Sequence, residues 1–503
     1  MFKLGVFGMK RILDSVHGYI TIPEELVTGI VDTVFFQRLR RIEQTSGRSL
    51  FPSARHDRFI HSLGVFYLGS KIVDGLISRD LSTLKKNENY LSVLYTYEIA
   101  CLLHDVGHTP FSHTFENYYE NPYNKLKESL LSLVEKEEPD FVLDFENQFS
   151  ESAPHERISA ILSVKYFRTI IENTHDWLPV GAAKGNVSLL ARMIVGCRYQ
   201  DNQHCLENSF IDLLHSKVLD ADGLDYVCRD SWASGYSTSL IDIDRLIDSI
   251  TILDDGNFTL CYKVKAINEI KAVLSIKDFQ QSNVFTHHLV KYEQALLRKA
   301  MESVALTLSD KKITDDPTVR REALQFFCRI ESFEPAGFTP KGLTPIFYPM
   351  DDDFISMMKY CPEDEYVKQW ISRNYKLKAL WKSRERFILD FKAANLENLN
   401  ESSWIFTDHC RMFISDKFGI DPHDIWIEEA TPKSRLKELL NTNLLIDGAP
   451  LKYQVLYSKE PLQSSQKLNW FYYIYLPIKN NSGEKLLFDE IRKSVKTKFF
   501  EES

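Results

Sequence analysis

The sequence lacks the paired cysteines that mark a disulfide framework or a thiolate zinc site. Its 8 cysteines are scattered, with no CxxC pair, and this pattern indicates reduced thiols in a cytosolic protein. No uninterrupted apolar run approaches the ~20 residues that span a bilayer. The N-terminus is too short and too interrupted for a secretory signal. We therefore expect a cytoplasmic protein with no membrane segment.

An excess of positive charge is also lacking. With 61 Lys and Arg against 70 Asp and Glu, the net charge is −9. A general nucleic-acid coat protein is disfavoured, because phosphate neutralisation needs a basic surface. A small anionic substrate fits if basic residues are concentrated locally, as they are between Arg38 and Arg58. At 503 residues and 44% hydrophobic, the chain can bury a large core and is expected to form more than one domain.

Repeats and low-complexity tracts are absent from the sequence, and most of it follows a helical pattern. We expect a strand-like lead-in over 1–22, a loop over 45–57 and a hairpin centred on 254–257. Residues 451–459 and 468–477 alternate like strands. Helices are expected over 24–43, 58–78, 90–104, 155–167, 188–195, 217–236, 265–308, 351–359 and 363–398, and from 484 onward.

These patterns predict a mainly α fold with a small α+β C-terminal region. We place a boundary near residue 334, where prolines and glycines accumulate, so that 1–334 forms the core. Within it, the acidic and lysine-rich stretch 117–153 is expected to be a helical insertion. Residues 335–503 would form either a lid or an oligomerisation element.

A group of histidines and acids could hold a metal. His61, the adjacent pair His104-Asp105 and the later Asp222 would make a site of two imidazoles and two carboxylates. Mixed nitrogen and oxygen ligands suit Mn, Mg, Fe or Zn, and the residue types do not choose among them. The sequence therefore predicts a site for one divalent metal.

The pair His104-Asp105 requires a break in the helix. Adjacent residues on a helix point ~100° apart, so both can face one ion only if the backbone deviates. Gly107 and Pro110 lie where such a deviation would occur. The simpler interpretation is that His104 caps a helix and Asp105 pairs with a nearby arginine.

Four segments then follow one another along the chain: FPSARHDRFIHSLGV, IACLLHDVGHTPFSHTFE, PHE at 154–156 and VLDADGLDYVCRD. In order and spacing they resemble the motifs of the HD-domain deoxynucleoside triphosphate (dNTP) triphosphohydrolases. The resemblance runs from about Lys10 to His288, and it fades over 117–153 and beyond about 310. It implies an HD-domain helical phosphohydrolase core that needs a divalent metal.

The resemblance also implies roles for individual residues. Metal ligands would be His61, His104, Asp105 and Asp222. His155, assisted by His113, would protonate the departing 5′-oxygen after attack at the α-phosphorus. The residues implied to contact the phosphates are Arg58, which also belongs to the catalytic group, His108 and Lys277. Those implied to line the sugar are Gln44, Thr45, Tyr226, Asp230 and Phe285.

Simpler interpretations exist for some of these residues. His155 could satisfy the first turn of a helix that begins at Pro154, and Tyr226 and Asp230 could belong to a solvated helix face. The sequence also departs from the family at two places. Gly223 stands where the eukaryotic member has a phosphate-binding lysine, and Phe285 stands near the place of a tyrosine that helps to exclude a 2′-hydroxyl.

A regulatory nucleotide site is suggested near the N-terminus. Asp32, Gln37 and Arg40 match residues that read a guanine in regulated family members, and Lys10 matches a phosphate contact there. Arg245 matches a residue of an adjoining pocket. The resemblance implies that such pockets lie between subunits of a homo-oligomer, a tetramer, which the nucleotide would favour. Alternatively, these side chains only decorate a helix.

The expected function is hydrolysis of dNTPs, dGTP among them, to deoxynucleoside and tripolyphosphate. GTP, dGTP or another dNTP would activate it, for control of dNTP pools or for depletion of dNTPs during phage infection; neither nucleic acid nor a membrane would be required. One alternative is an HD phosphohydrolase acting on an oligonucleotide, a cyclic dinucleotide or a monophosphate. The cyclic dinucleotide is disfavoured because no GYP-type signature follows His104-Asp105. Another alternative is a non-catalytic nucleotide sensor.

Overall fold

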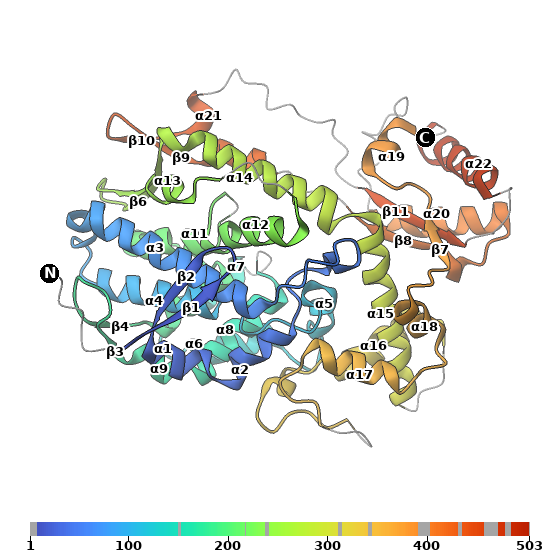
Figure 1. The fold of residues 1–503 in the computed structure, drawn as a ribbon, viewed down its shortest axis with the longest axis horizontal. Helices are drawn as coiled ribbons and strands as arrows, with labels where there is room; N and C mark the ends of the chain where they lie inside the picture. Colours follow the sequence, from blue (N-terminus) through green and yellow to red (C-terminus); the bar gives the residue numbers. More distant parts are fainter. Residues whose placement is uncertain are drawn as a thin grey trace. The chain divides into compact units, whose positions relative to one another are not determined.

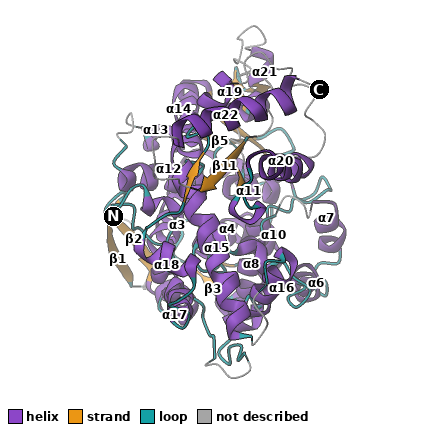
Figure 2. Cartoon of the chain, turned by 90° about the vertical axis from the view of Figure 1, so that its right-hand side faces the viewer, coloured by secondary structure: helices purple, strands orange, loops and turns teal. Residues whose placement is uncertain are grey.

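The computed structural model describes residues 8–148, 152–216, 218–236, 241–309, 314–340, 345–390, 403–430, 435–456, 471–477 and 484–501. The chain forms two compact units. The first contains Met1–Lys277, Gln325–Ile355 and Arg435–Glu460, and the second contains Asp278–Leu324, Ser356–Ser434 and Pro461–Ser503. Helices make up most of the described chain, with strands confined to small sheets (Figure 1, Figure 2). The mainly α fold with a minor β component is confirmed.

The helices of the first unit are α1 (Glu24–Leu26), α2 (Val34–Gln37), α3 (Arg58–Leu84), α4 (Tyr90–Leu103), α5 (Glu116–Tyr119), α6 (Leu126–Val134), α7 (Asp140–Gln148), α8 (Pro154–Tyr166), α9 (Arg168–Glu172), α10 (Val187–Val195), α11 (Cys205–Leu214), α12 (Ala221–Ser234), α13 (Ile243–Ile247), most of α14 (Ile267–Gln280) and α21 (Tyr453–Leu456). Its strands are β1 (Met9–Asp14), β2 (Gly18–Pro23), β3 (Thr174–His175), β4 (Ala183–Lys184), β5 (Ile250–Leu253), β6 (Thr259–Lys263), β9 (Asn443–Ile446) and β10 (Ala449–Lys452).

The second unit takes in α15 (His288–Leu308), α18 (Glu365–Ser372), α19 (Arg384–Asp390), α20 (Ser403–Phe418) and α22 (Glu484–Lys496), with β7 (Leu377–Ala379), β8 (Trp426–Glu429) and β11 (Tyr472–Pro477). Helices α16 (Pro317–Phe327) and α17 (Asp351–Lys359) each pass from one unit into the other.

Two long helices form the centre of the first unit. Helix α3 begins after Asp57, whose side chain accepts the backbone N–H of Ile60 at 3.0 Å and so caps the first turn. Helix α4 is almost wholly apolar and is buried from Val93 onward, because other helices cover it on several sides. It ends at Leu103, so the expected break beside His104 is present.

The strand-like N-terminal segment and the predicted hairpin both form paired strands. Strand β1 pairs antiparallel with β2, from Met9 opposite Pro23 to Asp14 opposite Gly18. Strand β5 pairs antiparallel with β6 around the turn at 254–257. Strand β6 also pairs in parallel with β9. Strand β9 pairs antiparallel with β10, so that the sheet order is β10-β9-β6-β5.

The helix predicted over 24–43 was wrong in its continuity. The chain forms α1, a π turn over Val27–Val31, α2 and a 3₁₀ turn over Arg38–Arg41. Side chains provide the physical reason. The Thr33 hydroxyl donates to the Ile30 carbonyl at 2.6 Å, and the Gln37 amide donates to the Val31 carbonyl at 2.8 Å. These bonds replace backbone bonds that a continuous helix would make.

The helix predicted over 363–398 was also wrong. Helix α18 ends at Ser372, because the next residue, Arg373, has a left-handed φ of 56°. The chain then forms β7, because Leu377–Ala379 pairs antiparallel with β11, and α19 follows. Residues 391–398 lie outside the described residues. Of the predicted strand 451–459, the first two residues end β10, α21 follows, and 457–459 lie outside the described residues.

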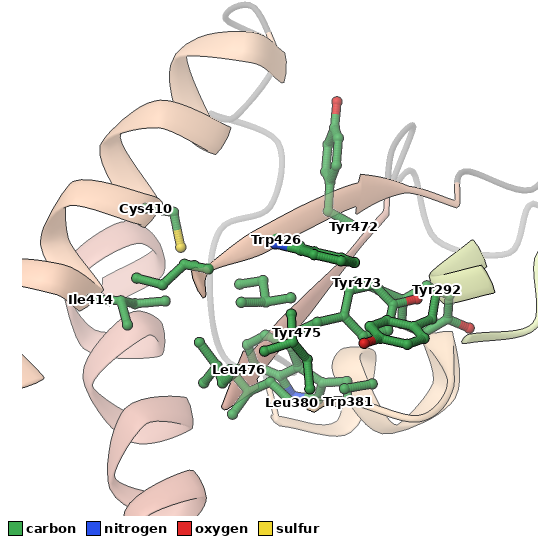
Figure 3. Close-up of a cluster of buried hydrophobic side chains, with 14 of the residues drawn as sticks. Tyr292, Leu380, Trp381, Cys410, Ile414, Trp426, Tyr472, Tyr473, Tyr475 and Leu476 are labelled. Carbon is green, nitrogen blue, oxygen red and sulfur yellow. The ribbon is translucent and has the colours of Figure 1, made fainter. Parts of the chain in front are cut away.

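The second unit has its own core around β11, the central strand of the sheet β7-β11-β8. Figure 3 shows side chains from α20, β8 and β11 gathered there: Cys410, Ile414, Trp426, Tyr473 and Tyr475. The contacts thus divide the chain elsewhere than at residue 334, since part of the C-terminal region completes the sheet of the first unit.

Two further observations concern membrane-spanning helices and disulfides. No helix among the described residues is long and apolar enough to cross a membrane. All 8 cysteines lie in the described part of the chain, and none is in a disulfide there.

Candidate metal and phosphate site

Three helices of the first unit bring the predicted metal ligands together. His61 lies in the first turn of α3, His104 directly follows α4, and Asp222 lies in the first turn of α12. Their ligand atoms all lie within 4.8 Å of one another. Asp105 completes the group, because its Oδ2 lies 3.6 Å from His61 Nε2 and 3.7 Å from His104 Nε2. All four predicted ligands are therefore assembled.

The chemistry of this group fits a divalent metal. The Nε2 atoms of His61 and His104 are buried and have no hydrogen-bond partner within the described chain, and both face carboxylates. Burial would lower the pKa of His61, but Asp222 and Asp225 raise it to about 9. The pocket thus favours a positive charge between these groups, and a divalent cation would supply one. Two imidazoles and two carboxylates are compatible with Mn, Mg, Fe or Zn.

The simpler roles expected of His104 and Asp105 are present as well, and they serve the site. His104 Nδ1 donates to the Cys101 carbonyl at 2.9 Å, which leaves Nε2 free to face the group. Asp105 Oδ2 accepts from Arg58 Nη1 at 2.6 Å. Burial would raise the pKa of Asp105, but Arg58 and the neighbouring histidines hold it well below its usual range. Asp105 is therefore ionised and oriented.

A carboxylate that was not among the predicted residues holds His61 from behind. Asp225 is fully buried, and its Oδ2 lies 2.7 Å from His61 Nδ1. Asp225 Oδ1 lies 2.7 Å from His17 Nε2, and Asp225 Oδ2 also accepts from Arg229 Nε at 2.8 Å. Burial would raise the pKa of Asp225, but Arg229, His17 and His61 hold it well below its usual range. Such a partner fixes the tautomer and the ring orientation of a metal-binding histidine.

The Asp225 network extends to the N-terminal hairpin. Arg229 Nη1 donates to Asp14 Oδ1 at 2.9 Å, so β1 is tied to α12. Gly64 makes this approach possible, because a Cβ at that position would collide with the Asp225 carboxylate and the Arg229 guanidinium. One sequence signal could have identified Asp225: it follows Asp222 by three residues and therefore shares its helix face.

A second group of imidazoles adjoins the first. His155, the second residue of α8, stacks on His108 with ring centroids 4.2 Å apart, and His113 lies 5.1 Å from both rings. Glu116 contacts two of them: its Oε2 lies 2.6 Å from His155 Nδ1, and its Oε1 lies 3.2 Å from His113 Nδ1. Glu116 was not predicted, although it follows His113 by only three residues.

Glu116 determines the charge of His155. Burial would lower the pKa of His155, but the charge and hydrogen bond of Glu116 raise it to about 9. Burial would raise the pKa of Glu116, but His113 and His155 hold it well below its usual range. His155 therefore carries a proton at neutral pH. The first turn of α8 is capped by Glu156, which accepts from the Ala153 N–H at 2.6 Å, so His155 is not needed for that task.

His108 connects the two groups. It is 0% exposed, neither ring nitrogen has a hydrogen-bond partner within the described residues, and its Nε2 lies 3.7 Å from Asp105 Oδ1. Burial and the charge of Arg58 hold its pKa well below the usual range, so the ring is neutral. His108, His113 and His155 lie close enough to share a cation, but the proton on His155 favours an anion there.

Arg58 is buried and fully engaged. Besides Asp105, it donates from Nη2 to the Gln44 carbonyl at 3.2 Å and from Nε to the Ser112 hydroxyl at 3.0 Å. The structure therefore gives it a clear role in holding a metal ligand and the loop after α4. A direct contact between Arg58 and phosphate stays a prediction.

Lys277 lies beside the glycine that replaces the family's lysine. It is 6% exposed, and its Nζ lies 3.8 Å from Asp220 Oδ1 and 5.4 Å from the centre of the Tyr226 ring. A Cβ at Gly223 would collide with that ammonium group. Burial would lower the pKa of Lys277, but Asp220 and Tyr226 raise it. The ammonium group of Lys277, on α14, therefore places a positive charge beside Gly223, where the family's lysine is missing.

The other residues predicted to line the sugar lie in different settings. Asp230 is buried, with its Oδ1 2.6 Å from His56 Nε2. Gln44 is buried, and its side-chain carbonyl has no partner within the described residues. The Thr45 hydroxyl accepts a backbone N–H. Phe285 is half-buried in the second unit. Contact between these residues and a sugar stays a prediction.

Two pairs among the predicted regulatory residues are in contact. Lys10 Nζ lies 3.8 Å from Asp32 Oδ2, with both side chains about half exposed. Arg40 Nε donates to Gln37 Oε1 at 2.9 Å. Arg245 lies on α13, where its nearest charged partner is an acid of α14 at 3.2 Å. The recognition of a nucleotide by these residues stays a prediction.

Comparison with known proteins supports the family expected from the sequence. Residues 58–179 match the family model described as HD domain. An uncharacterized protein of Methanocaldococcus jannaschii is 28% identical over 58% of this chain and 49% of its own length. The deoxynucleoside triphosphate triphosphohydrolase SAMHD1 homolog of Dictyostelium discoideum is 26% identical over 61% of this chain and 52% of its own. The chain thus spans about half the length of these curated relatives.

Identity is higher within a shorter stretch, and a solved structure shares the fold. SAMHD1 of Gallus gallus is 46% identical over 22% of this chain and 17% of its own length. The crystal structure of a phosphohydrolase from Bacteroides thetaiotaomicron covers 93% of this chain and 100% of its own, with 21% identity and a TM-score of 0.61. The chain therefore contains an HD domain and is similar, over part of its length, to proteins named deoxynucleoside triphosphate triphosphohydrolase.

Proposed function

We propose that this protein hydrolyses dNTPs, dGTP among them, to a deoxynucleoside and tripolyphosphate. The observation that carries the proposal is the pairing of Glu116 with His155, which keeps a protonated imidazole stacked at 4.2 Å on His108. His108 Nε2 in turn lies 3.7 Å from Asp105 Oδ1. Asp105 belongs to the metal group, by which we mean the four predicted ligands His61, His104, Asp105 and Asp222. A proton donor, a neutral donor for phosphate oxygens and a metal group thus stand side by side. The relatives named as dNTP triphosphohydrolases support the same substrate class.

In the proposed reaction, the oxygen of a water molecule bonds to the α-phosphorus as the bond to the 5′-oxygen breaks. His155 gives its proton to the 5′-oxygen, which leaves as the hydroxyl of the nucleoside. Glu116 holds the imidazole with Nδ1 toward itself, so that Nε2 carries the transferable proton. The water's proton passes to solvent or to a neighbouring carboxylate, and the three phosphates leave together.

Other groups bind and orient the triphosphate. His108 can donate from a neutral ring, and Lys277 adds a buried positive charge beside Gly223. His61, His104, Asp105 and Asp222 would hold a divalent metal, which when bound neutralises phosphate charge and lowers the pKa of water. Tyr226 and Gln44, with Thr45 and Asp230, are proposed to contact the nucleoside.

Regulation by a guanine nucleotide is part of the proposal. Lys10 and Asp32 lie 3.8 Å apart, and Arg40 is bonded to Gln37, so a cation for phosphate and a carboxylate for the N–H groups of guanine are near each other. Arg245 would belong to an adjoining pocket. Binding of GTP, dGTP or another dNTP would favour a homo-oligomer, a tetramer. Control of dNTP pools and depletion of dNTPs during phage infection are the proposed roles.

Product analysis tests this function. The purified protein is incubated with Mn²⁺ and each dNTP, singly and in mixtures, and the products are separated by ion-exchange chromatography. Deoxynucleoside and tripolyphosphate are expected. Orthophosphate or a nucleoside monophosphate would refute the proposal in favour of another phosphohydrolase, and no turnover in any mixture would favour a nucleotide sensor. His104→Ala and Asp105→Ala are expected to lose both bound metal and turnover.

A further inference from the structure

The residue that begins α17 is a buried carboxylate with two backbone partners. Asp351 is 6% exposed. Its Oδ2 accepts the backbone N–H of Glu43 at 2.9 Å, and its Oδ1 accepts that of Phe111 at 2.5 Å. The second contact joins residues 240 positions apart in the sequence. One side chain therefore ties the segment before α3 to the loop after α4.

The loop that Asp351 reaches has an unfavourable backbone conformation. Phe111 and Ser112 have φ values of 54° and 51°, in the left-handed region that residues other than glycine rarely adopt. Such residues persist only where their surroundings hold them, and they occur preferentially at functional sites. They directly precede His113, so their conformation determines where that imidazole points.

A closed ring of hydrogen bonds holds this conformation. Asp351 binds the N–H of Phe111, and the Ser112 hydroxyl donates to the Glu43 carbonyl at 2.5 Å. The N–H of Glu43 returns to Asp351. Arg58 Nε donates to the same Ser112 hydroxyl, so the ring also contacts the arginine that orients Asp105. Loss of the Asp351 carboxylate would open the ring at two of its bonds.

Neighbouring residues fasten the same segment to the same loop. Arg38 is 2% exposed and donates from Nη1 to the Pro349 carbonyl at 2.8 Å and from Nη2 to the His108 carbonyl. The rings of Phe354 and Phe115 meet edge to face, with centroids 4.9 Å apart. Three independent contacts thus place residues 349–354 against the loop that carries His108 and His113.

We propose that Asp351 is a positioning residue of the active site. Its carboxylate holds the left-handed pair Phe111–Ser112 and thereby directs His113 toward His155, and through Ser112 it supports Arg58. This inference rests on the proposed function for its catalytic consequence, but not for the contacts themselves. Residues 335–503 were expected to form a lid or an oligomerisation element. Asp351 belongs to this range, and its proposed role needs no movement of a lid.

Kinetics test the catalytic consequence. Asp351→Ala removes both acceptors, whereas Asp351→Asn keeps one. We expect kcat to fall ~10–100-fold in Asp351→Ala, because misplacement of catalytic groups by ~1 Å has effects of this size. KM should change less than ~3-fold, since substrate-binding groups are retained, and Asp351→Asn should recover part of kcat. Asp352→Asn is the matched control, with a side chain 61% exposed, and should match the wild type.

Hydrogen exchange tests the contacts without any reaction. The amide of Phe111, followed in peptides covering 104–116, should exchange about tenfold faster or more in Asp351→Ala, because loss of a hydrogen bond of ~1.4 kcal/mol corresponds to that factor. Peptides from α10 should not change. If Asp351→Ala does not fold, Asp351→Asn carries both measurements. Unchanged protection of Phe111, or a kcat equal to that of Asp352→Asn, would overturn the proposal. Faster exchange in a protein whose wild type hydrolyses no dNTP would leave the positioning contact standing and refute the proposed function alone.

Discussion

Asp225 and His61 face each other in the interior of the first unit, with 2.7 Å between Oδ2 and Nδ1. The contact directs the other ring nitrogen, Nε2, toward Asp222, Asp105 and His104. Asp225 itself is held by Arg229 and His17. The metal group therefore depends on a buried layer of charged partners as well as on its own four residues.

The first prediction concerns this layer. Asp225→Asn keeps the size of the side chain but removes its charge, so His61 loses the partner that fixes its tautomer. We expect affinity for Mn²⁺ to fall ~10–100-fold, the usual effect of losing such a partner, as measured by metal titration and elemental analysis. Asp244→Asn, with a side chain 76% exposed, should bind metal like the wild type. Equal affinity in both variants would show that Asp225 does not orient the ligand.

The second prediction concerns pH. His155 has a raised pKa of about 9, so the proton needed for catalysis is present below that pH and is lost as the pH rises through it. Glu116→Gln removes the charge that outweighs burial, and the pKa of His155 should fall below its ordinary value of ~6.5. The alkaline limb of the kcat profile should therefore move to lower pH by about two units or more. Glu135→Gln, an exposed acid on another turn, is the control, and an unmoved limb in Glu116→Gln would exclude His155 as the acid.

The third prediction concerns the buried lysine. Lys277→Met should raise KM for dNTPs and weaken inhibition by tripolyphosphate ~10–100-fold, because a hydrogen bond to a charged group contributes ~1.5–3 kcal/mol. Lys277→Arg should retain most of the binding. Lys265→Met removes an exposed charge near the start of α14 and should change neither constant. Thermal unfolding is measured alongside, since Lys277 also pairs with Asp220. Unchanged tripolyphosphate inhibition in Lys277→Met would remove it from the phosphate site.

The fourth prediction concerns regulation. Asp32→Ala removes the carboxylate that would accept the N–H groups of guanine and leaves Lys10 without its partner. We expect the ratio of the rates with and without GTP to fall to about one, and GTP should no longer shift the protein to a larger assembly in analytical ultracentrifugation. Asp248→Asn, with a side chain 64% exposed, should respond to GTP like the wild type. Full stimulation of Asp32→Ala would place the regulatory site elsewhere.

The metal ligands could be predicted from the sequence because they occur in long motifs. HDRFIHSLG and LLHDVGHTPFSH contain several chemically unusual residues at fixed spacing, and the helices that carry them have clear apolar patterns. The carboxylates behind them could not be predicted in the same way. Asp225 and Glu116 are single acids whose role depends on which histidine lies opposite, and Asp351 acts on a loop 240 residues away.

The errors in secondary structure have a similar origin. Residues 24–43 have apolar positions at helical spacing, but the Thr33 and Gln37 side chains take backbone carbonyls that a helix would use. The stretch over 363–398 is interrupted because Leu377–Ala379 pairs with β11, far along the chain. Local periodicity records which face of an element is apolar, and it does not record a side-chain bond or a distant strand that competes for the backbone.

The central claim is that water attacks the α-phosphorus, so that the bond between this phosphorus and the 5′-oxygen breaks and tripolyphosphate leaves intact. Hydrolysis of dGTP and the other dNTPs in water enriched in ¹⁸O, followed by mass spectrometry, tests it most directly. The prediction is one ¹⁸O atom in tripolyphosphate and none in the deoxynucleoside. Label in orthophosphate, in a monophosphate or in the deoxynucleoside would contradict it.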